Sequence, residues 1–205
     1  MKTYQTICFN NEIDWNKVPV GKVDFFNWES TDPYRPYTEF QLCFKENEGV
    51  FVKMKTDEQN LRIVCRGRDE NCWEDSCMEF FFLPFSEEDG YINFEMTPTG
   101  AYLSAFGKGR ENRQFLREIT DKAPEVNGKI SSDGWEISLF IPCELVEDVF
   151  RMPFSASDGT YKGNFYKCGD LTDKPHYASY SPMGELPPGF HNSKLFADIS
   201  VIKEY

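Results

Sequence analysis

Residues 71–82 read NCWEDSCMEFFF, and this stretch decides the fold because its polar and apolar side chains alternate. Side chains of an extended chain point to opposite faces with a period of two. Ser76, Met78, Phe80 and Phe82 therefore share one face, which is apolar apart from its first member. The opposite face interleaves acids with aromatic and thiol side chains: Trp73, Asp75, Cys77, Glu79 and Phe81. We predict a strand with one face in a core and the other face in a site.

The next apolar run, YINFEM at residues 91–96, repeats the alternation. Ile92, Phe94 and Met96 fall on one face. The opposite face carries Tyr91, Asn93 and Glu95. Two neighbouring strands thus present a mixed polar and aromatic surface.

Short alternating runs separated by Gly, Pro, Asp and Asn continue along the chain, which is typical of antiparallel sandwiches and barrels. We predict an all-β fold, a β-sandwich of two antiparallel sheets with one or two short helices. Trp135 shares a face with three aliphatic residues of WEISLFI and is predicted to lie in the core, and PCELVEDVF at 142–150 predicts a short helix. The expected strands are 4–9, 39–45, 50–56, 61–66, 77–83, 91–96, 101–106, 129–132, 135–141, 161–168, 176–181 and 196–202. The stretch 170–192, rich in Pro and Gly, predicts a long loop around one of them.

The composition indicates one folded domain over residues 1–205, because 40% apolar and 16% aromatic residues supply a large core. The net charge of −12 and the pI near 4.7 repel phosphate backbones and anionic lipids. Nucleic acids and membranes are therefore not expected partners. The first residues contain no apolar stretch of the kind found in signal peptides, so a cytoplasmic location is expected for the chain as written. An extracellular or periplasmic location is expected only if the chain was trimmed.

The seven cysteines are odd in number and lie mostly in apolar runs, so we expect buried, reduced thiols. Six and four residues separate Cys65, Cys72 and Cys77, and the only histidines are His176 and His191. This spacing does not predict structural zinc, which usually uses CxxC pairs. No cofactor is expected, although PFSEEDG together with Asp69, Glu70 and Asp75 offers oxygen ligands for a structural calcium ion.

Five blocks of the sequence together resemble the family 9-like carbohydrate-binding modules. In chain order they are WEDSCMEFFFLP, GYINFEMTPTGAYLSAFGKGR, WEISLFIP, GNFYKCGDLTDKPHYASYSP and FHNSKLFADISV. The resemblance covers nearly the whole chain and implies a sandwich of two antiparallel sheets. It also implies binding of a mono- or oligosaccharide, with two aromatic rings around a terminal sugar and with charged and amide groups on its hydroxyls.

The resemblance also suggests which residues form the site. Trp73 is similar to the first aromatic ring and Glu79 to the acid, and Tyr180 stands where the family pattern has a second Trp. Arg110 resembles the family arginine, with Arg113 and Arg117 following it at helical spacing. Asn164 and His176 are further polar contacts that the resemblance implies.

Three other interpretations stay open from the sequence. Paired carboxylates among Asp75, Glu79 and Glu95 would suit an enzyme that hydrolyses glycosidic bonds, but no acid pair stands out among 34 acids. The lack of a well-defined acid pair and the resemblance along nearly the whole chain favour a non-catalytic module over this hydrolase. A sandwich that has lost its ligand and serves a structural or interaction role is the second alternative, and a related haem-binding sandwich with Met and His ligands is the third.

Overall fold

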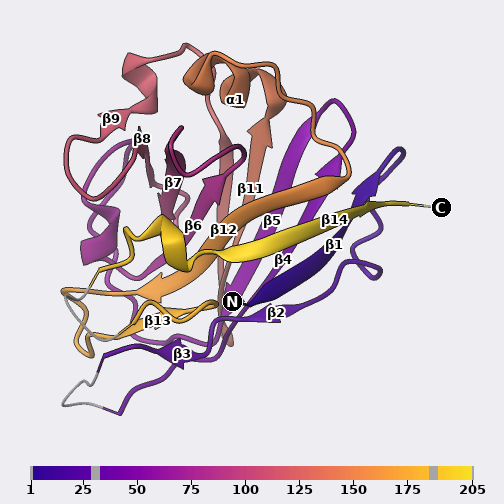
Figure 1. The fold of residues 1–205 in the computed structure, drawn as a ribbon. Helices are drawn as coiled ribbons and strands as arrows, with labels where there is room; N and C mark the ends of the chain where they lie inside the picture. Colours follow the sequence, from indigo (N-terminus) through magenta and orange to yellow (C-terminus); the bar gives the residue numbers. More distant parts are fainter. Residues whose placement is uncertain (1, 29–32, 185–188, 205) are drawn as a thin grey trace.

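The protein is described here by a computed structural model, which covers residues 2–28, 33–184 and 189–204. Within these ranges the chain forms fourteen strands, one α-helix and three short 3₁₀ turns (Figure 1). The strands are β1 Thr3–Phe9, β2 Gly21–Lys22, β3 Phe25–Phe26, β4 Thr38–Lys45, β5 Gly49–Thr56, β6 Cys77–Leu83, β7 Tyr91–Met96, β8 Tyr102–Gly107, β9 Gln114–Phe115, β10 Glu125–Ser131, β11 Gly134–Pro142, β12 Gly159–Cys168, β13 Tyr177–Ser179 and β14 Ala197–Lys203. The helical segments are α1 Cys143–Phe150, η1 Cys72–Glu74, η2 Leu116–Glu118 and η3 Ser193–Leu195.

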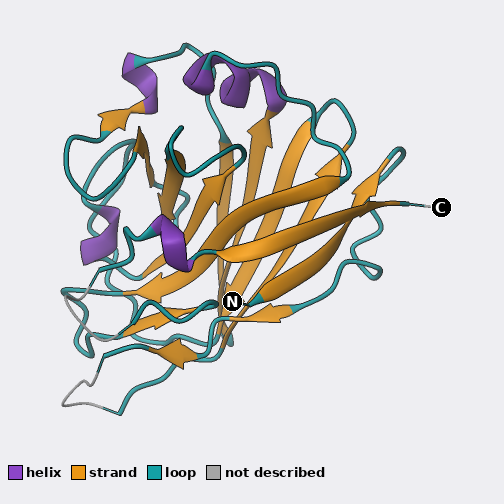
Figure 2. Ribbon diagram, viewed as in Figure 1, coloured by secondary structure: helices purple, strands orange, loops and turns teal. Residues whose placement is uncertain are grey.

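The strands form one continuous curled sheet in the order β10-β11-β5-β4-β1-β14-β12-β6-β7-β8-β9. The short strands β2, β3 and β13 attach to its side. All pairs between named strands are antiparallel except those of β1, which runs parallel to both β14 and β4. The all-β sandwich expectation is confirmed, with the addition that β1 and β14 join the two halves into a single mixed sheet. Figure 2 shows that the helical segments lie outside this sheet.

The main core fills the space between the two halves of the sheet. Phe40 of β4 stacks on Phe165 of β12, with 3.6 Å between ring centroids, so the halves meet ring against ring. Met78, Phe80 and Phe82 belong to this core, as their alternation predicts, and so does Trp135. Since each such side chain is almost fully buried, its transfer from water stabilises the fold by about 1.5–3 kcal/mol.

A second apolar cluster covers the opposite face of β12, β6 and β7. Cys77, Phe81, Tyr91 and Tyr166 are buried in it, and Phe190 and Phe196 from the C-terminal segment pack over them. Every residue of β6 and β7 is therefore buried. The sequence predicted an open polar face here, but loops cover most of it, which leaves the acids of these strands in a largely apolar setting.

The expected strand at 61–66 is wrong. Residues 61–66 have no regular secondary structure, and the amides of Val64 and Cys65 donate to Asp75 Oδ2 at 2.7 and 2.8 Å instead of to a neighbouring strand. The Asp75 carboxylate therefore satisfies the backbone donors that a sheet partner would otherwise satisfy. The other long strands and the helix after Pro142 are found within a few residues of the predicted bounds.

The seven cysteines are buried, as predicted, and they are free thiols in the structure. In the described ranges, no helix has both the length and the apolar character needed to cross a membrane.

Phe80→Ala tests the main core. Phe80 is fully buried and stacks on Phe82 and Phe165, so the deletion leaves a cavity and should lower the free energy of unfolding by about 3–5 kcal/mol. Phe25→Ala is the matched control, because that ring is 40% exposed and its loss should cost about 1 kcal/mol or less. Urea unfolding of both variants measures the difference. Equal losses would show that the two halves do not form one core.

Candidate functional site

Two glutamates face each other on adjacent strands. Glu79 of β6 pairs directly with Glu95 of β7, and the two residues are only 3% and 5% exposed. Burial raises the pKa of Glu95 to about 7. Burial, followed by the charges of Cys168 and Glu95, raises the pKa of Glu79 well above its usual value. The sheet thus holds two carboxyl groups in a setting that disfavours two negative charges.

The two carboxyl groups differ in their hydrogen bonds. The Cys168 thiol donates to Glu79 Oε1 at 2.9 Å, and Asn93 Nδ2 donates to Glu95 Oε1 at 2.8 Å. Glu95 Oε2 is buried and has no hydrogen-bond partner in the structure. A buried carboxyl oxygen without a partner costs free energy, and it is the type of acceptor that a ligand hydroxyl can satisfy.

Arg113 contributes a positive charge to this face. Its Nη2 and Nε donate to Asn93 Oδ1 at 2.6 and 2.9 Å, and its guanidinium lies 4.4 Å from the centre of the Tyr91 ring. Through Asn93 it orients the amide that bonds Glu95. The charge of Arg113 also acts to lower the pKa of Glu95, against the larger effect of burial.

Trp73 lies beside these carboxyl groups on the turn η1, which contacts β6 and β7. The carbonyl of Trp73 accepts from the Asp170 amide at 3.1 Å, and the Cys168 sulfur lies 3.9 Å from the same oxygen. The ring is half-buried against the second apolar cluster. It therefore keeps part of its surface free for a ligand.

Tyr177 is the second aromatic side chain of this region. It pairs with Cys168 across β13 and β12 and is half-buried, and the edge of Trp28 supports its ring at 5.9 Å between centroids. Burial, and then the charge of Asp170, raises the pKa of Tyr177 to about 12. Trp73 and Tyr177 thus reach the neighbourhood of Cys168 from two different elements. We use the name Glu79 site for Trp73, Glu79, Glu95, Cys168, Asp170 and Tyr177.

Three of the residues implied by the resemblance lie at or near this site. Trp73 and Glu79 belong to it. Arg110 is exposed, and its charge acts to lower the pKa of Asp170, although burial outweighs it and the pKa is raised. Arg113, from the same arginine-rich segment, is the one that reaches over the sheet.

Asn164, Tyr180 and His176 have structural partners instead. Asn164 is fully buried, accepts from the amides of Phe165 and Ser181 and donates to the Ser181 carbonyl. Tyr180 lies in the main core, and its hydroxyl donates to the Thr3 carbonyl at 3.0 Å. Tyr180 is therefore placed away from the Glu79 site, and Tyr177 replaces it as the candidate second ring. The strand pairing of β13 with β12, which sets Tyr177 opposite Cys168, is what identifies it.

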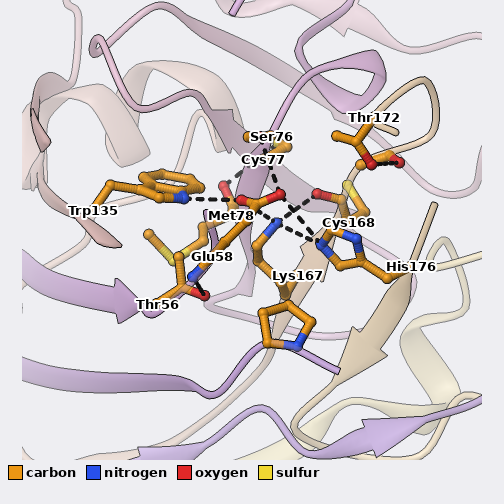
Figure 3. A network of polar contacts seen from close by, with 12 residues as sticks. Thr56, Glu58, Ser76, Cys77, Met78, Trp135, Lys167, Cys168, Thr172 and His176 are labelled. Atoms are coloured by element: carbon orange, nitrogen blue, oxygen red, sulfur yellow. Dashed lines mark hydrogen bonds and ion pairs between the residues drawn. The ribbon is translucent and has the colours of Figure 1, made fainter. Parts of the chain in front are cut away.

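His176 belongs to a buried polar network inside the curled sheet (Figure 3). Lys167 Nζ contacts Glu58 Oε2 at 2.9 Å, donates to His176 Nε2 at 2.8 Å and donates to the Cys168 carbonyl at 2.8 Å. Trp135 Nε1 and Ser76 Oγ donate to Glu58 at 2.9 and 3.0 Å. All three ammonium protons and both carboxylate oxygens therefore have partners, which a buried ion pair requires.

The histidine in this network is neutral. His176 Nδ1 bonds the Lys174 carbonyl at 2.8 Å and so must carry the proton, which leaves Nε2 to accept from Lys167. Burial, and then the Lys167 charge, lowers the pKa of His176 to about 4. The network is adjacent in sequence to the Glu79 site at two points, since Lys167 precedes Cys168 and His176 precedes Tyr177.

Two of the acids that the sequence offered for calcium are engaged elsewhere. Asp75 bonds Arg62 and two backbone amides, and Asp69 pairs with Arg117. Among the residues that the structure describes, one group of three metal-ligating side chains has its ligand atoms mutually within 4.8 Å, and it consists of Cys77, Glu79 and Cys168. Calcium binding stays a prediction.

Comparison with known proteins agrees with this fold. The sequence profile of carbohydrate-binding family 9 matches residues 8–201. A solved structure of a "putative carbohydrate-binding protein" from Bacteroides uniformis is 28% identical, with a TM-score of 0.79 over 98% of this chain and 99% of that chain. No match was found among proteins of curated function.

Two more distant structures share the fold. Both are of a family 9 carbohydrate-binding module from Caldicellulosiruptor kristjanssonii, each 10% identical to this chain. The complex with glucose has a TM-score of 0.68 and covers 100% of this chain and 97% of that one. The complex with cellotriose has a TM-score of 0.63 and covers 100% and 95%.

Lys167→Met tests the buried network. The variant leaves Glu58 charged, buried and short of one partner, so the free energy of unfolding should fall by about 3–5 kcal/mol. Lys129→Met is the matched control, because the Lys129–Glu136 pair is exposed and should contribute at most about 1 kcal/mol. Chemical unfolding at neutral pH measures both. A loss in Lys167→Met no larger than in the control contradicts the structural role of the network.

His191→Gln tests the second histidine, which is half-buried and bonds the Tyr91 hydroxyl through Nδ1. Burial, and then the charges of Arg113 and Arg110, lowers the pKa of His191 to about 3. Between this value and the unfolded pKa of about 6.5, the unfolded chain binds a proton that the folded chain does not. The stability that His191 contributes is therefore present above about pH 6.5 and is lost as the pH falls, with a slope of up to about 1.4 kcal/mol per pH unit.

The variant lacks this titration, so its unfolding free energy should fall less steeply than that of the wild type between pH 6.5 and pH 4. The two glutamates titrate in both proteins, and their contribution cancels in the difference between the two curves. Parallel curves would show that His191 is not held neutral in the folded state.

Proposed function

The chain belongs to carbohydrate-binding family 9, and on this premise we propose that it is a non-catalytic carbohydrate-binding domain whose ligand contacts the Glu79 site. The ligand class is a mono- or oligosaccharide with a terminal sugar that sits against Trp73 and Tyr177. The observation that carries this proposal is the half-buried Trp73 on a turn that contacts β6 and β7, the two strands that carry the paired glutamates.

The chemistry of the site suits a sugar. A pyranose has an apolar C–H face and a rim of hydroxyls, so it binds to an aromatic plate with a few polar partners. Trp73 and Tyr177 supply the aromatic surface, and Glu79 and Glu95 supply carboxyl oxygens. Arg110 is exposed, and its charge acts on the pKa of Asp170. It supplies a cation at the rim of the site.

The relatives support the same class of ligand. The two Caldicellulosiruptor structures hold glucose and cellotriose, and the Bacteroides relative aligns along almost its whole length. We therefore choose glucose and cellotriose as the first probes. One aromatic clamp with two or three charge-assisted hydrogen bonds leads us to expect dissociation constants of about 1 mM to 1 μM.

A groove on another part of the surface is a weaker candidate. It is a groove of about 470 Å³ across β4, β5, β11 and β10, lined mostly by Lys, Glu and small polar side chains. The aromatic residue on it, Phe40, is buried in the main core and offers no stacking surface. The Glu79 site combines aromatic surface with buried carboxyl groups and is preferred for this reason.

Hydrolysis of glycosidic bonds is the alternative that uses the same residues. Directly opposed carboxyl groups with raised pKa values are also a feature of glycosidases. Incubation with aryl glycosides and with cellotriose separates the two functions. Binding without release of phenol or glucose is expected, and turnover that disappears in Glu79→Gln would favour the enzyme.

Four substitutions test the sugar site by calorimetric titration. Trp73→Ala should weaken binding of the better probe by about 30-fold or more, because the loss of a buried apolar contact costs about 2 kcal/mol. Tyr177→Ala should weaken it to a similar extent. Glu79→Gln keeps an acceptor and loses only charge assistance, so a loss of about 3- to 10-fold is expected. Tyr37→Ala is the control, because that ring is 48% exposed and lies on a different part of the sheet.

Tyr180→Phe completes the test. The substitution removes the hydrogen bond to Thr3 and should lower stability slightly while sugar affinity stays unchanged. The site assignment is wrong if Tyr180→Phe abolishes binding and Tyr177→Ala does not. Thermal unfolding of each variant shows whether a loss of binding reflects a loss of the fold.

A further inference from the structure

Two cysteines and a glutamate meet on the outer face of the sheet. Cys77 and Glu79 are two residues apart on β6 and share a face, and the register of β12 places Cys168 directly opposite Cys77. One ligand atom from each, two sulfurs and a carboxylate oxygen, lies within 4.8 Å of the other two. Local sequence patterns do not predict this group, because its third member, Cys168, lies 89 residues from Glu79 in the chain.

The two sulfur atoms and the carboxylate oxygen determine which class of metal the group suits. Thiolates bind soft and borderline cations such as Zn²⁺, whereas Ca²⁺ needs six to eight oxygen ligands. Zinc sites with three protein ligands also occur, and they keep a fourth position open. Zn–S distances of about 2.3 Å and Zn–O distances of about 2.0–2.2 Å require ligand atoms that are close to one another. The present group meets this requirement with small side-chain shifts.

The surroundings supply more donor atoms. The Trp73 carbonyl oxygen is 3.9 Å from Cys168 Sγ. Cys72 lies next to Trp73, is buried in the same cluster as Cys77 and Cys168, and is close enough for its charge to influence Cys77. The three ligands are thus enclosed by apolar side chains, with a backbone oxygen and a further thiol nearby.

We propose that Cys77, Cys168 and Glu79 form a three-ligand binding site for a cation of the Zn²⁺ class. Binding forms two metal–sulfur bonds and one metal–oxygen bond, and the two thiol protons, with any proton on Glu79, pass to the solvent. No electron transfer takes place. The fold already places the ligands, so the cation binds to the folded chain with the thiols reduced.

A consequence for the Glu79 site rests on the function proposed above. A cation on Glu79 withdraws that carboxyl group from a sugar, so each ligand should weaken the binding of the other by the same factor. The cation site itself does not depend on sugar binding. It is therefore tested in the absence of sugar.

The experiment is a titration of the full chain with Cd²⁺, a spectroscopic substitute for Zn²⁺, under a thiol-free reductant. The wild type should bind one Cd²⁺ with a thiolate-to-cadmium charge-transfer band in the near ultraviolet. Cys77→Ser, Cys168→Ser and Glu79→Gln should each weaken binding at least tenfold. Cys43→Ser is the matched control, because Cys43 is fully buried in a separate cluster with Phe9 and Val18, and it should bind as the wild type does.

A measurement on the wild type alone covers the case in which a serine variant does not fold. X-ray absorption by the Zn²⁺ complex should show two sulfur neighbours at about 2.3 Å together with oxygen neighbours. A zinc shell without sulfur overturns the proposal. So does Cd²⁺ binding that is as tight in folded Cys168→Ser as in the wild type, or a wild type that gives no thiolate band.

Discussion

The buried ion pair between Lys167 and Glu58 is the constraint on which the rest of the site depends. Lys167 is an inward-facing residue of β12, so its ammonium group is forced into the interior, where it needs partners for all of its protons. Glu58 reaches it from the irregular segment after β5, and His176 reaches it from the loop before β13. Breaking such a pair leaves an uncompensated charge, so few alternative arrangements of these segments are tolerated.

The inward position of Lys167 also determines which side chains of β12 face outward. Because side chains alternate along a strand, holding Lys167 inside holds Cys168 outside, and a slip of one residue would exchange them. The same register places Cys168 opposite Cys77 and within hydrogen-bond distance of Glu79. The loop after Cys168 then bonds the backbone of Trp73 through Asp170. An interaction inside the sheet thereby positions the aromatic ring and the carboxyl group outside it.

Much of the fold could be predicted from the sequence, because alternation is a local property. Phe80 and Trp135 were assigned to the core from the period of two, and both are in it. The strand expected at 61–66 failed for a reason that is not local, since the Asp75 side chain takes the place of a neighbouring strand. Local patterns record which residues are apolar, but they do not record which donor a distant carboxylate will satisfy.

The candidate site residues also differ in whether local alternation could predict them. Trp73 and Glu79 lie within the stretch whose alternation was read directly, and the structure brings them together. The ring expected from the block around β13 was Tyr180, three residues beyond Tyr177, and an odd separation puts the two rings on opposite faces. Arg113 was also less evident than Arg110, because only the folded turn shows which guanidinium returns over the sheet.

Burial raises the pKa of both carboxyl groups of the site. An exposed sugar site can use ionised carboxylates, but Glu79 and Glu95 face each other in an apolar cluster, where two negative charges at short distance are costly. A neutral sugar supplies hydroxyls but no charge, so it offsets little of the cost of two buried negative charges. A cation would offset most of that cost. The sugar and the cation proposed above would both use Glu79, whose Oε1 accepts a hydrogen bond from the Cys168 thiol in the structure.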